Sequence, residues 1–168
     1  MPSTRHRKRS GLALALFTGA SLVGVAPAVA TEQRYQADDW IAECDGPADN
    51  GSACSITVPF WQTADEGRGS FALVVMLQTG DIGLVGTPPP MRAVLRIDKN
   101  PEAVCRGEHY CVFPSGQALA LRRELDDASL ILIDVYTAKS RFSFSLSPIG
   151  YRAGLAQIRA WGYPLAEN

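Results

Sequence analysis

The four cysteines are the residues whose spacing points most directly to chemistry. Cys44 and Cys54 are ten residues apart, and Cys105 and Cys111 are six residues apart. An even number of cysteines in a small exported domain is typical of disulfide bonds. Three pairings are possible, and closeness in the chain favours Cys44 with Cys54 and Cys105 with Cys111. The spacings do not match the paired Cys-x-x-Cys knuckles of a metal site, so we expect neither a metal nor a cofactor.

His109 is the side chain best suited to proton transfer. The other histidine, His6, lies in an N-terminal segment that we expect to be removed. A Ser-His-Asp site could therefore use only His109, and no Gly-x-Ser-x-Gly elbow, phosphate-binding glycine loop or dinucleotide fingerprint accompanies it. Its position between Cys105 and Cys111 predicts an exposed residue in a tight disulfide loop. A binding or proton-transfer role is the alternative.

Paired carboxylates are the second candidate for hydrolytic chemistry, because two acids about 5 to 10 Å apart can hydrolyse a glycosidic bond. The chain has such neighbours at Asp38-Asp39, Asp65-Glu66 and Asp126-Asp127. Each pair falls in a predicted turn or near the end of a predicted element, where acids ordinarily serve solubility and capping. We therefore expect solvated surface at these positions and assign no catalytic residue.

The first thirty residues have the three parts of a secretory signal peptide. A basic run from Arg5 to Arg9 precedes an apolar stretch from Leu12 to Val25, and Ala28-Val29-Ala30 follows as a cleavage site. The stretch is diluted by small and polar residues and is shorter than the roughly 20 apolar residues of a stable membrane span; a retained anchor is the alternative. We predict cleavage of residues 1–30 before Thr31, no integral membrane segment afterwards, and a periplasmic or secreted bacterial protein.

The charge balance changes once this segment is set aside. It holds four of the sixteen basic residues and none of the seventeen acidic ones, so the remaining 138 residues carry twelve basic against seventeen acidic residues, a net charge of −5. The arginines are scattered, and the pair Arg122-Arg123 is followed at once by Glu124. Nucleic-acid binding needs a concentrated basic face, so we expect no nucleic-acid partner.

Residues 31–168 are enough for a single domain, and no repeat or linker divides them. Most of this part is patterned as β-strands. Phe142, Phe144 and Leu146 alternate with serines, which is typical of a strand with one exposed face. Short segments rich in Val, Ile, Phe and Trp predict further strands at Gln33–Glu43, Ala53–Trp61, Gly69–Gln78 and Met91–Asp98.

The segment from Leu130 to Val135 is apolar at nearly every position, which predicts a central strand covered on both faces. Asp134 interrupts this run and would need a polar partner, and Thr137 to Ser140 could turn the strand into a hairpin with the next one. By contrast, glycines and three consecutive prolines between Gly80 and Pro90 predict a loop or a protected edge. We expect this stretch to be the most mobile surface.

Two helices complete the predicted fold. A short helix near 117–127 follows from the apolar stripe of Ala118, Leu121 and Leu125. A second helix near 148–161 has Ser147 as a cap, Pro148 at its first position, and a stop at Gly162 and Pro164. We predict a mainly β fold, a single antiparallel β-sandwich or barrel-like domain, with the second helix packed across the sheet through Tyr151, Leu155, Ile158 and Trp161.

The order of these landmarks resembles the invasion-associated locus B family of bacterial envelope proteins. The resemblance spans nearly all of the chain after the signal segment. It implies an all-β periplasmic or surface-associated domain without known catalytic residues. The landmarks are Trp40 with Cys44, Cys54-Ser55-Ile56, Leu95-Arg96-Ile97-Asp98 ahead of Cys105 and Cys111, Leu119 to Leu125, a strand from Leu130, and Ser145-Leu146 through Gly150-Tyr151 to Ala153, Leu155 and Ile158.

The sequence therefore favours a non-enzymatic exported module that binds an unidentified protein or envelope component. The alternatives are a small periplasmic hydrolase that uses His109 or a carboxylate pair, and a periplasmic enzyme inhibitor that inserts a disulfide-closed loop. Trp40, Trp61 and Trp161 are expected to serve core or rim packing. Candidate binding residues lie in the two cysteine-closed loops at 45–53 and 106–110, and they are Asp45, Asp49, Asn50, Arg106, Glu108, His109 and Tyr110.

Overall fold

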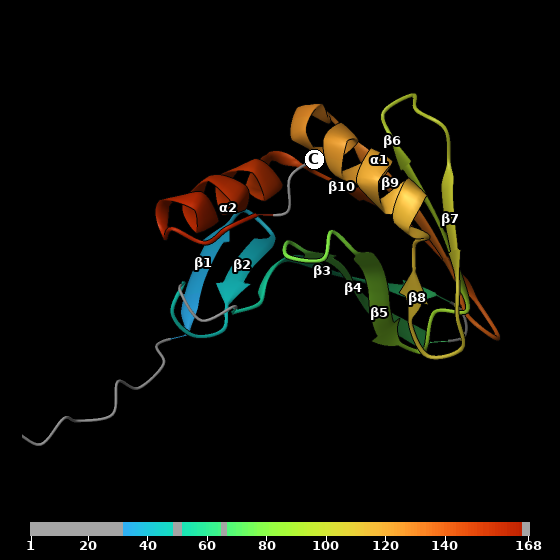
Figure 1. The fold of residues 1–168 in the computed structure, drawn as a ribbon. Helices are drawn as coiled ribbons and strands as arrows, with labels where there is room; N and C mark the ends of the chain where they lie inside the picture. Colours follow the sequence, from blue (N-terminus) through green and yellow to red (C-terminus); the bar gives the residue numbers. More distant parts are fainter. Residues whose placement is uncertain (1–31, 49–51, 65–66, 166–168) are drawn as a thin grey trace, which may run out of the picture.

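The computed structural model of the chain describes residues 32–48, 52–64 and 67–165. These residues form a mainly β domain with two helices (Figure 1). The predicted fold class is thereby confirmed. The predicted signal segment, residues 1–30, lies outside the described residues. None of the helices in the described ranges is long and apolar enough to span a membrane.

One antiparallel sheet contains all the strands of the described residues. These strands are β1 (Gln33–Ala37), β2 (Trp40–Cys44), β3 (Cys54–Ala64), β4 (Gly67–Met76), β5 (Ile82–Thr87), β6 (Arg92–Ile97), β7 (Ala103–Arg106), β8 (Cys111–Val112), β9 (Ile131–Tyr136) and β10 (Arg141–Leu146). Their order across the sheet is β1-β2-β3-β4-β5-β8-β7-β6-β9-β10. Strands β1 to β5 thus form one half of the sheet as a meander. The other half, β6 to β10, joins it through the pairing of β5 with β8.

The sheet curls until its last strand faces its first half. The ring of Phe142 on β10 lies 5.2 Å from the ring of Phe71 on β4, and Phe144 lies 4.5 Å from Phe60 on β3, both between ring centroids. These aromatic contacts join residues on opposite halves, and such pairs add roughly 0.5–1.5 kcal/mol beyond their area burial. The result is a half-barrel with a concave inner face.

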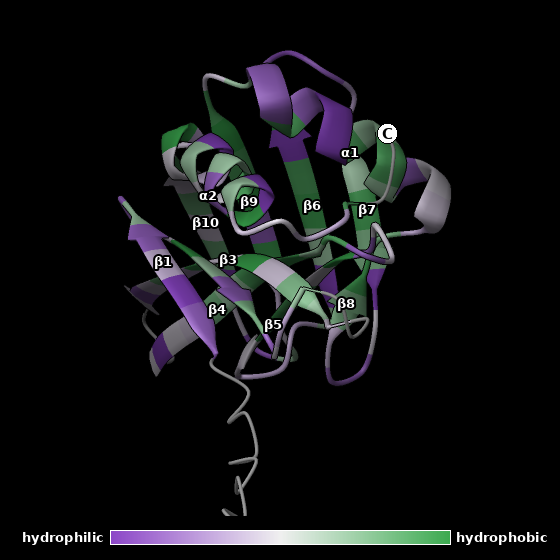
Figure 2. Cartoon of the chain, turned by 60° about the vertical axis from the view of Figure 1, so that its left-hand side comes forward, coloured by the Kyte–Doolittle hydropathy of each residue, from purple (hydrophilic) through white to green (hydrophobic). Residues whose placement is uncertain are grey.

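Two helices cover the concave face (Figure 1). Helix α1 (Ser115–Asp127) packs against β6, and α2 (Ile149–Ala160) packs against β1, β2 and β3. In Figure 2 the strands β6 and β9 behind the helices are mostly hydrophobic, whereas the edge strand β1 is mostly hydrophilic. Both predicted stripes are confirmed as buried core residues, namely Ala118, Leu121 and Leu125 in α1 and Tyr151, Leu155 and Ile158 in α2, with Trp161 partly buried.

The C-terminal end of α2 follows the sequence signals, whereas the predicted cap at Ser147 is wrong by one residue. Pro148 is the N-cap rather than the first helical residue, and the Ser147 hydroxyl accepts the Ile149 N–H at 3.4 Å. Gly162 ends the helix in a left-handed conformation, with φ at 85°, which glycine adopts without steric cost. Helix α1 begins at Ser115, two residues before the predicted start, because the Pro114 carbonyl accepts the first N–H groups of the helix.

The prediction of a loop or edge between Gly80 and Pro90 is wrong. Residues Ile82 to Thr87 form β5, which pairs with β4 on one side and β8 on the other. Gly86 fits because the ring of Phe71 occupies the space of its missing side chain: a Cβ on Gly86 would lie 2.2 Å from Cδ1 of Phe71, whereas a Cβ on Gly83 would make only ordinary contacts. The prolines begin only after the strand, and the Thr87-Pro88 peptide bond is cis.

Two other strand predictions need correction. The segment Gln33–Glu43 is a hairpin of β1 and β2 instead of one strand, because Asp38 turns the chain with φ at 50°, a conformation that aspartate tolerates. Strand β9 is covered on one face only: Ile131, Ile133 and Val135 are buried, but the residues between them are half-buried. The helices lie on the concave side alone, so the other face stays open.

The remaining strand predictions are confirmed with small shifts at the ends. The hairpin of β9 and β10 closes through Thr137, whose N–H donates to the Ser140 carbonyl at 2.9 Å and whose hydroxyl accepts the Ser140 N–H at 3.0 Å. Of the three tryptophans, Trp40 is buried, whereas Trp61 on β3 is 62% exposed. Trp61 therefore does not serve core packing, and its exposure becomes relevant below.

Candidate functional site

Both predicted disulfides are present. Cys44 is bonded to Cys54, its direct partner in the β2–β3 ladder, and Cys105 is bonded to Cys111. All four side chains are buried, so the bonds anchor loop ends to the core. In the chain-entropy model, closing loops of this length stabilises the folded state by about 2–3 kcal/mol each.

The two closed loops lie at opposite ends of the sheet. The Cys44–Cys54 loop precedes β3, next to the start of β5. Cys111 pairs with Leu84 in β5, and the loop 106–110 continues from there toward Thr87, the other end of that strand. Asp45 is exposed in the first loop, while the candidates Asp49 and Asn50 fall outside the described residues.

The Cys105–Cys111 loop is tight and exposes most of its side chains. The Gly107 N–H donates to the Met91 carbonyl at 3.0 Å, and a Cβ on Gly107 would lie 1.7 Å from the Tyr110 carbonyl oxygen. The predicted candidates Arg106, Glu108, His109 and Tyr110 are all exposed. Within the described ranges His109 forms no hydrogen bond or ion pair with a carboxylate, so no observation favours the hydrolase alternative at this residue.

Arg106, at the start of this loop, lies in line with cations on the neighbouring strands. The sequence pattern does not reveal this row. Arg106 on β7 is opposite Arg92 on β6, Arg92 is opposite Tyr136 on β9, and Tyr136 is opposite Arg141 on β10. Directly opposed residues in a sheet point to the same face, here the convex face away from the helices. Strands are about 4.8 Å apart. We call Arg106, Arg92, Tyr136 and Arg141 the arginine row.

The tyrosine holds two of these arginines in place. The guanidinium carbon of Arg92 lies 4.9 Å from the centroid of the Tyr136 ring, and that of Arg141 lies 5.4 Å from it. Such cation–π contacts are worth about 0.5–1 kcal/mol at exposed sites. Arg141 also forms an ion pair with Asp134, with 2.8 Å between Nη2 and Oδ2. Among the described residues, Arg92 and Arg106 have no acidic partner, so the row keeps positive charge.

Asp134 is the carboxylate that needed a partner, and it has two. The Ser143 hydroxyl donates to Oδ1 at 2.5 Å, and Arg141 donates to Oδ2. Burial acts to raise the pKa of Asp134, but the hydrogen bonds from Ser143 and Arg141, with the charges of Arg141 and Arg96, bring that pKa below its usual value. The same pair raises the pKa of Arg141. Asp134 is therefore ionised at neutral pH and is no proton donor.

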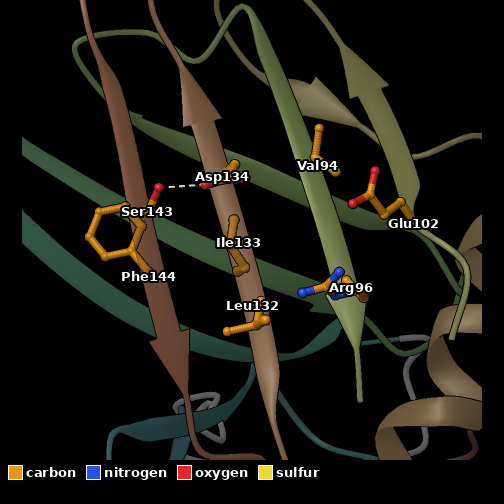
Figure 3. A pocket seen from close by; sticks show the side chains of 8 residues that line it. All are labelled: Val94, Arg96, Glu102, Leu132, Ile133, Asp134, Ser143 and Phe144. Carbon is orange, nitrogen blue, oxygen red and sulfur yellow. Dashed lines mark hydrogen bonds between the residues drawn. The ribbon is translucent and has the colours of Figure 1, made fainter. Parts of the chain in front are cut away.

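A hollow of about 200 Å³ lies beside the row on the convex face (Figure 3). Figure 3 shows Arg96 and Glu102 at one side, Ser143 at the other, and the Ser143–Asp134 hydrogen bond between them. Its carboxylate Asp134 is already engaged by Ser143 and Arg141. Its other carboxylate, Glu102, is exposed at the opposite side, and four of the eight lining residues are apolar.

A larger cleft of about 340 Å³ lies at the end of the sheet near the arginine row. It separates the start of β4 and the end of β5 from the hairpin that joins β9 to β10. Arg68 and Lys139 contribute positive charge from the two sides, and the rest of the lining combines hydroxyl-bearing and apolar residues. The cleft is lined by Gly67, Arg68, Thr87, Pro88, Thr137, Ala138, Lys139, Ser140 and Phe142.

The two carboxylate pairs within the described residues do not line either concavity. Asp38 and Asp39 are in the β1–β2 turn, and Asp126 and Asp127 are at the end of α1. Asp65-Glu66 lies outside the described residues. The described ranges contain no group of three or more His, Cys, Asp or Glu side chains that could hold a metal ion. Comparisons of the chain with protein-family models, curated proteins and solved structures give no match.

Proposed function

We propose that the chain is an exported, disulfide-stabilised, non-enzymatic protein of the bacterial envelope that binds a protein or another envelope component. The signal-like residues 1–30 and the two disulfides support export to an oxidising compartment. The resemblance to the invasion-associated locus B family is part of the same proposal. A host-directed role does not follow from it.

The arginine row is the observation that carries the binding proposal. Arg92 is stacked on Tyr136, so little conformational entropy is lost when it binds, and Arg106 lies opposite it at the end of β7, next to a disulfide-closed loop. Arginines presented this way suit carboxylate or phosphate groups, which they contact through paired hydrogen bonds. The domain therefore offers a preformed cationic surface despite its net negative charge.

Cosedimentation with purified bacterial envelopes tests this binding. Neutralising the row with Arg92→Gln and Arg106→Gln should weaken saturable binding about tenfold or more, because hydrogen bonds to charged groups contribute about 1.5–3 kcal/mol each. Lys99→Gln with Arg123→Gln is the matched control, since both cations are exposed and lie away from the row. Equal binding by the two double variants, or no saturable binding by the native protein, contradicts the proposal.

Intact-mass analysis of the secreted or periplasmic protein tests export separately. The expected mass corresponds to a chain that begins at Thr31 and lacks four hydrogens, one pair for each of the disulfides Cys44–Cys54 and Cys105–Cys111. A full-length N-terminus with four free thiols would contradict both cleavage and oxidation.

A further inference from the structure

The end of the domain that holds the loop 106–110 also gathers exposed aromatic and apolar side chains. Trp61 is 62% exposed, Tyr110 is 61% exposed and Met91 is 48% exposed. Trp61 shares a register row with Ser70 and Thr87, and Met91 precedes the strand that begins with Arg92. Three separate segments thus place large apolar groups in solvent at the same end.

Cationic side chains lie near these apolar groups. The guanidinium carbon of Arg68 lies 5.8 Å from the centroid of the Trp61 ring. Arg106 is in the same loop as Tyr110, and Lys139 is at the tip of the β9–β10 hairpin. We call this surface the docking end; it consists of Trp61, Arg68, Met91, Arg106, Tyr110 and Lys139, which are all exposed.

The described acids are distributed differently. Asp45, Asp81 and Glu102 lie at the opposite ends of the strands. At the docking end, Glu108 is the exposed acid of the described loop, and Asp134 nearby is already paired with Arg141. Arg68, Arg106 and Lys139 therefore give the docking end a local positive charge, which an anionic surface would attract.

We infer that the docking end binds an anionic phospholipid surface, with a lipid phosphate in the cleft between Arg68 and Lys139. This inference deepens the proposed function and rests on it. Tryptophan and tyrosine favour the boundary between lipid and water because their rings are apolar at one end and polar at the other. Lysine and arginine near that boundary attract anionic headgroups. The cleft adds the Thr87 hydroxyl as a hydrogen-bond donor for a phosphate oxygen.

A membrane fits these observations better than an acidic protein. Trp61, Met91 and Tyr110 project from different segments instead of lining one apolar groove, so they present separate points for shallow insertion. A protein-binding surface concentrates its aromatic anchors in the centre of the interface, in well-packed pockets. The cleft of about 340 Å³ combines Arg68 and Lys139 with apolar residues such as Pro88 and Phe142, which suits an amphipathic lipid.

Vesicle flotation with the exported, disulfide-bonded protein is the main test. Vesicles of equimolar phosphatidylglycerol and phosphatidylcholine should bind the native protein, and pure phosphatidylcholine should bind it poorly. Arg68→Gln with Lys139→Gln should lower partitioning roughly twentyfold, because each cation near an anionic surface contributes about fivefold. The control Lys99→Gln with Arg123→Gln should bind like the native protein.

Tryptophan fluorescence gives an independent measurement of insertion. Trp40 is buried and Trp161 is partly buried, so Trp61 should dominate a blue shift on adding the anionic vesicles. Trp61→Ser should abolish that shift and weaken binding to the vesicles. Trp61→Phe should preserve the binding. Absence of binding to the anionic vesicles overturns the inference. An equal loss of vesicle binding in Arg68→Gln with Lys139→Gln and in the control Lys99→Gln with Arg123→Gln also overturns it.

The outcomes separate this inference from the proposed function. If envelopes bind the native protein but not the arginine-row variant, while pure lipid vesicles bind neither, the partner is a protein or polymer and the lipid inference is wrong. If inorganic phosphate binds the protein and vesicles do not, the cleft is a soluble phosphate site and the inference is also wrong. If the anionic vesicles bind the native protein and lipid accounts for its binding to envelopes, both proposals are supported.

Discussion

Gly150 of α2 packs so closely on Trp40 of β2 that a Cβ on the glycine would lie 2.7 Å from Cδ1 of the tryptophan. The same Cβ would lie 2.1 Å from the Ala37 carbonyl oxygen. Trp40 is fixed in turn by its indole N–H, which donates to the Ser147 carbonyl at 2.7 Å, and by edge contact with Tyr151, 5.4 Å away between ring centroids. The position of α2 over the first hairpin therefore depends on the missing side chain.

Replacing this glycine should destabilise the fold. We expect Gly150→Ala to lower the free energy of unfolding by about 1–3 kcal/mol, because overpacking outweighs the gain of up to about 1 kcal/mol in helix propensity. Chemical denaturation followed by tryptophan fluorescence measures the change. Gly116→Ala in α1 is the control, because a Cβ there meets nothing within 4 Å, and it should be neutral or stabilising. Equal stability of the two variants would refute the close packing.

The ion pair on the convex face should appear in the pH dependence of stability. The pKa of Asp134 is lower in the folded protein than the ordinary value of about 3.9. A carboxyl with a depressed folded pKa contributes stability that is present above its unfolded pKa and is lost as the pH falls through the folded pKa. Asp134 should therefore stabilise the protein at neutral pH and contribute to its loss of stability in acid.

Removing the hydroxyl partner tests the cause of this shift. Ser143→Ala should raise the pKa of Asp134 in a carboxyl NMR titration, because one of the two hydrogen bonds to the carboxylate is lost. Ser145→Ala is the matched control: Ser145 is the next outward serine of β10, opposite Leu132. An unchanged pKa in Ser143→Ala would show that Arg141 and Arg96 hold the carboxylate ionised without the serine hydroxyl.

Local patterns were sufficient to predict much of the fold. The alternation around Phe142 and the turn before it predict the β9–β10 hairpin, because side-chain periodicity and turn chemistry are both local. The stripes through Leu121 and Tyr151 predict the two helices for the same reason. Short separations in the chain likewise favoured the correct disulfide pairs, since short loops close at lower entropic cost.

The cationic surface could not be predicted in this way. Tyr136 and Arg141 flank one hairpin, but Arg92 and Arg106 are distant from them in the sequence, and the four meet only because four strands pair in a particular register. Register is set by burial of the opposite face, which depends on contacts such as Phe71 with Phe142. A scattered set of arginines therefore gave no sign of a concentrated positive surface.

The two disulfides should differ in their effects on binding. Cys105→Ser with Cys111→Ser and Cys44→Ser with Cys54→Ser should each lower the free energy of unfolding by about 2–3 kcal/mol. The first pair should also weaken envelope binding, because the opened loop no longer holds Arg106 in the arginine row and Tyr110 beside it. The second loop is at the other end of the sheet, so its opening should leave binding unchanged in the folded fraction. Cosedimentation below the unfolding temperature checks this difference, and equal weakening by both pairs would contradict it.

The glycines of β5 provide a test of the strand that local patterns missed. A Cβ on Gly86 would lie 2.2 Å from Cδ1 of Phe71 and 2.7 Å from the Ser70 carbonyl oxygen, whereas on Gly83 the nearest atom would be 3.6 Å away. Phe71 contacts Phe142 across the concave face, so moving its ring would loosen the contact between the two halves of the sheet. Gly86→Ala should therefore lower the free energy of unfolding by about 1–3 kcal/mol, while Gly83→Ala should be nearly neutral. Both values follow from urea denaturation. A mobile loop at 80–90 would make the two substitutions equivalent, and that result would remove β5 from the centre of the sheet.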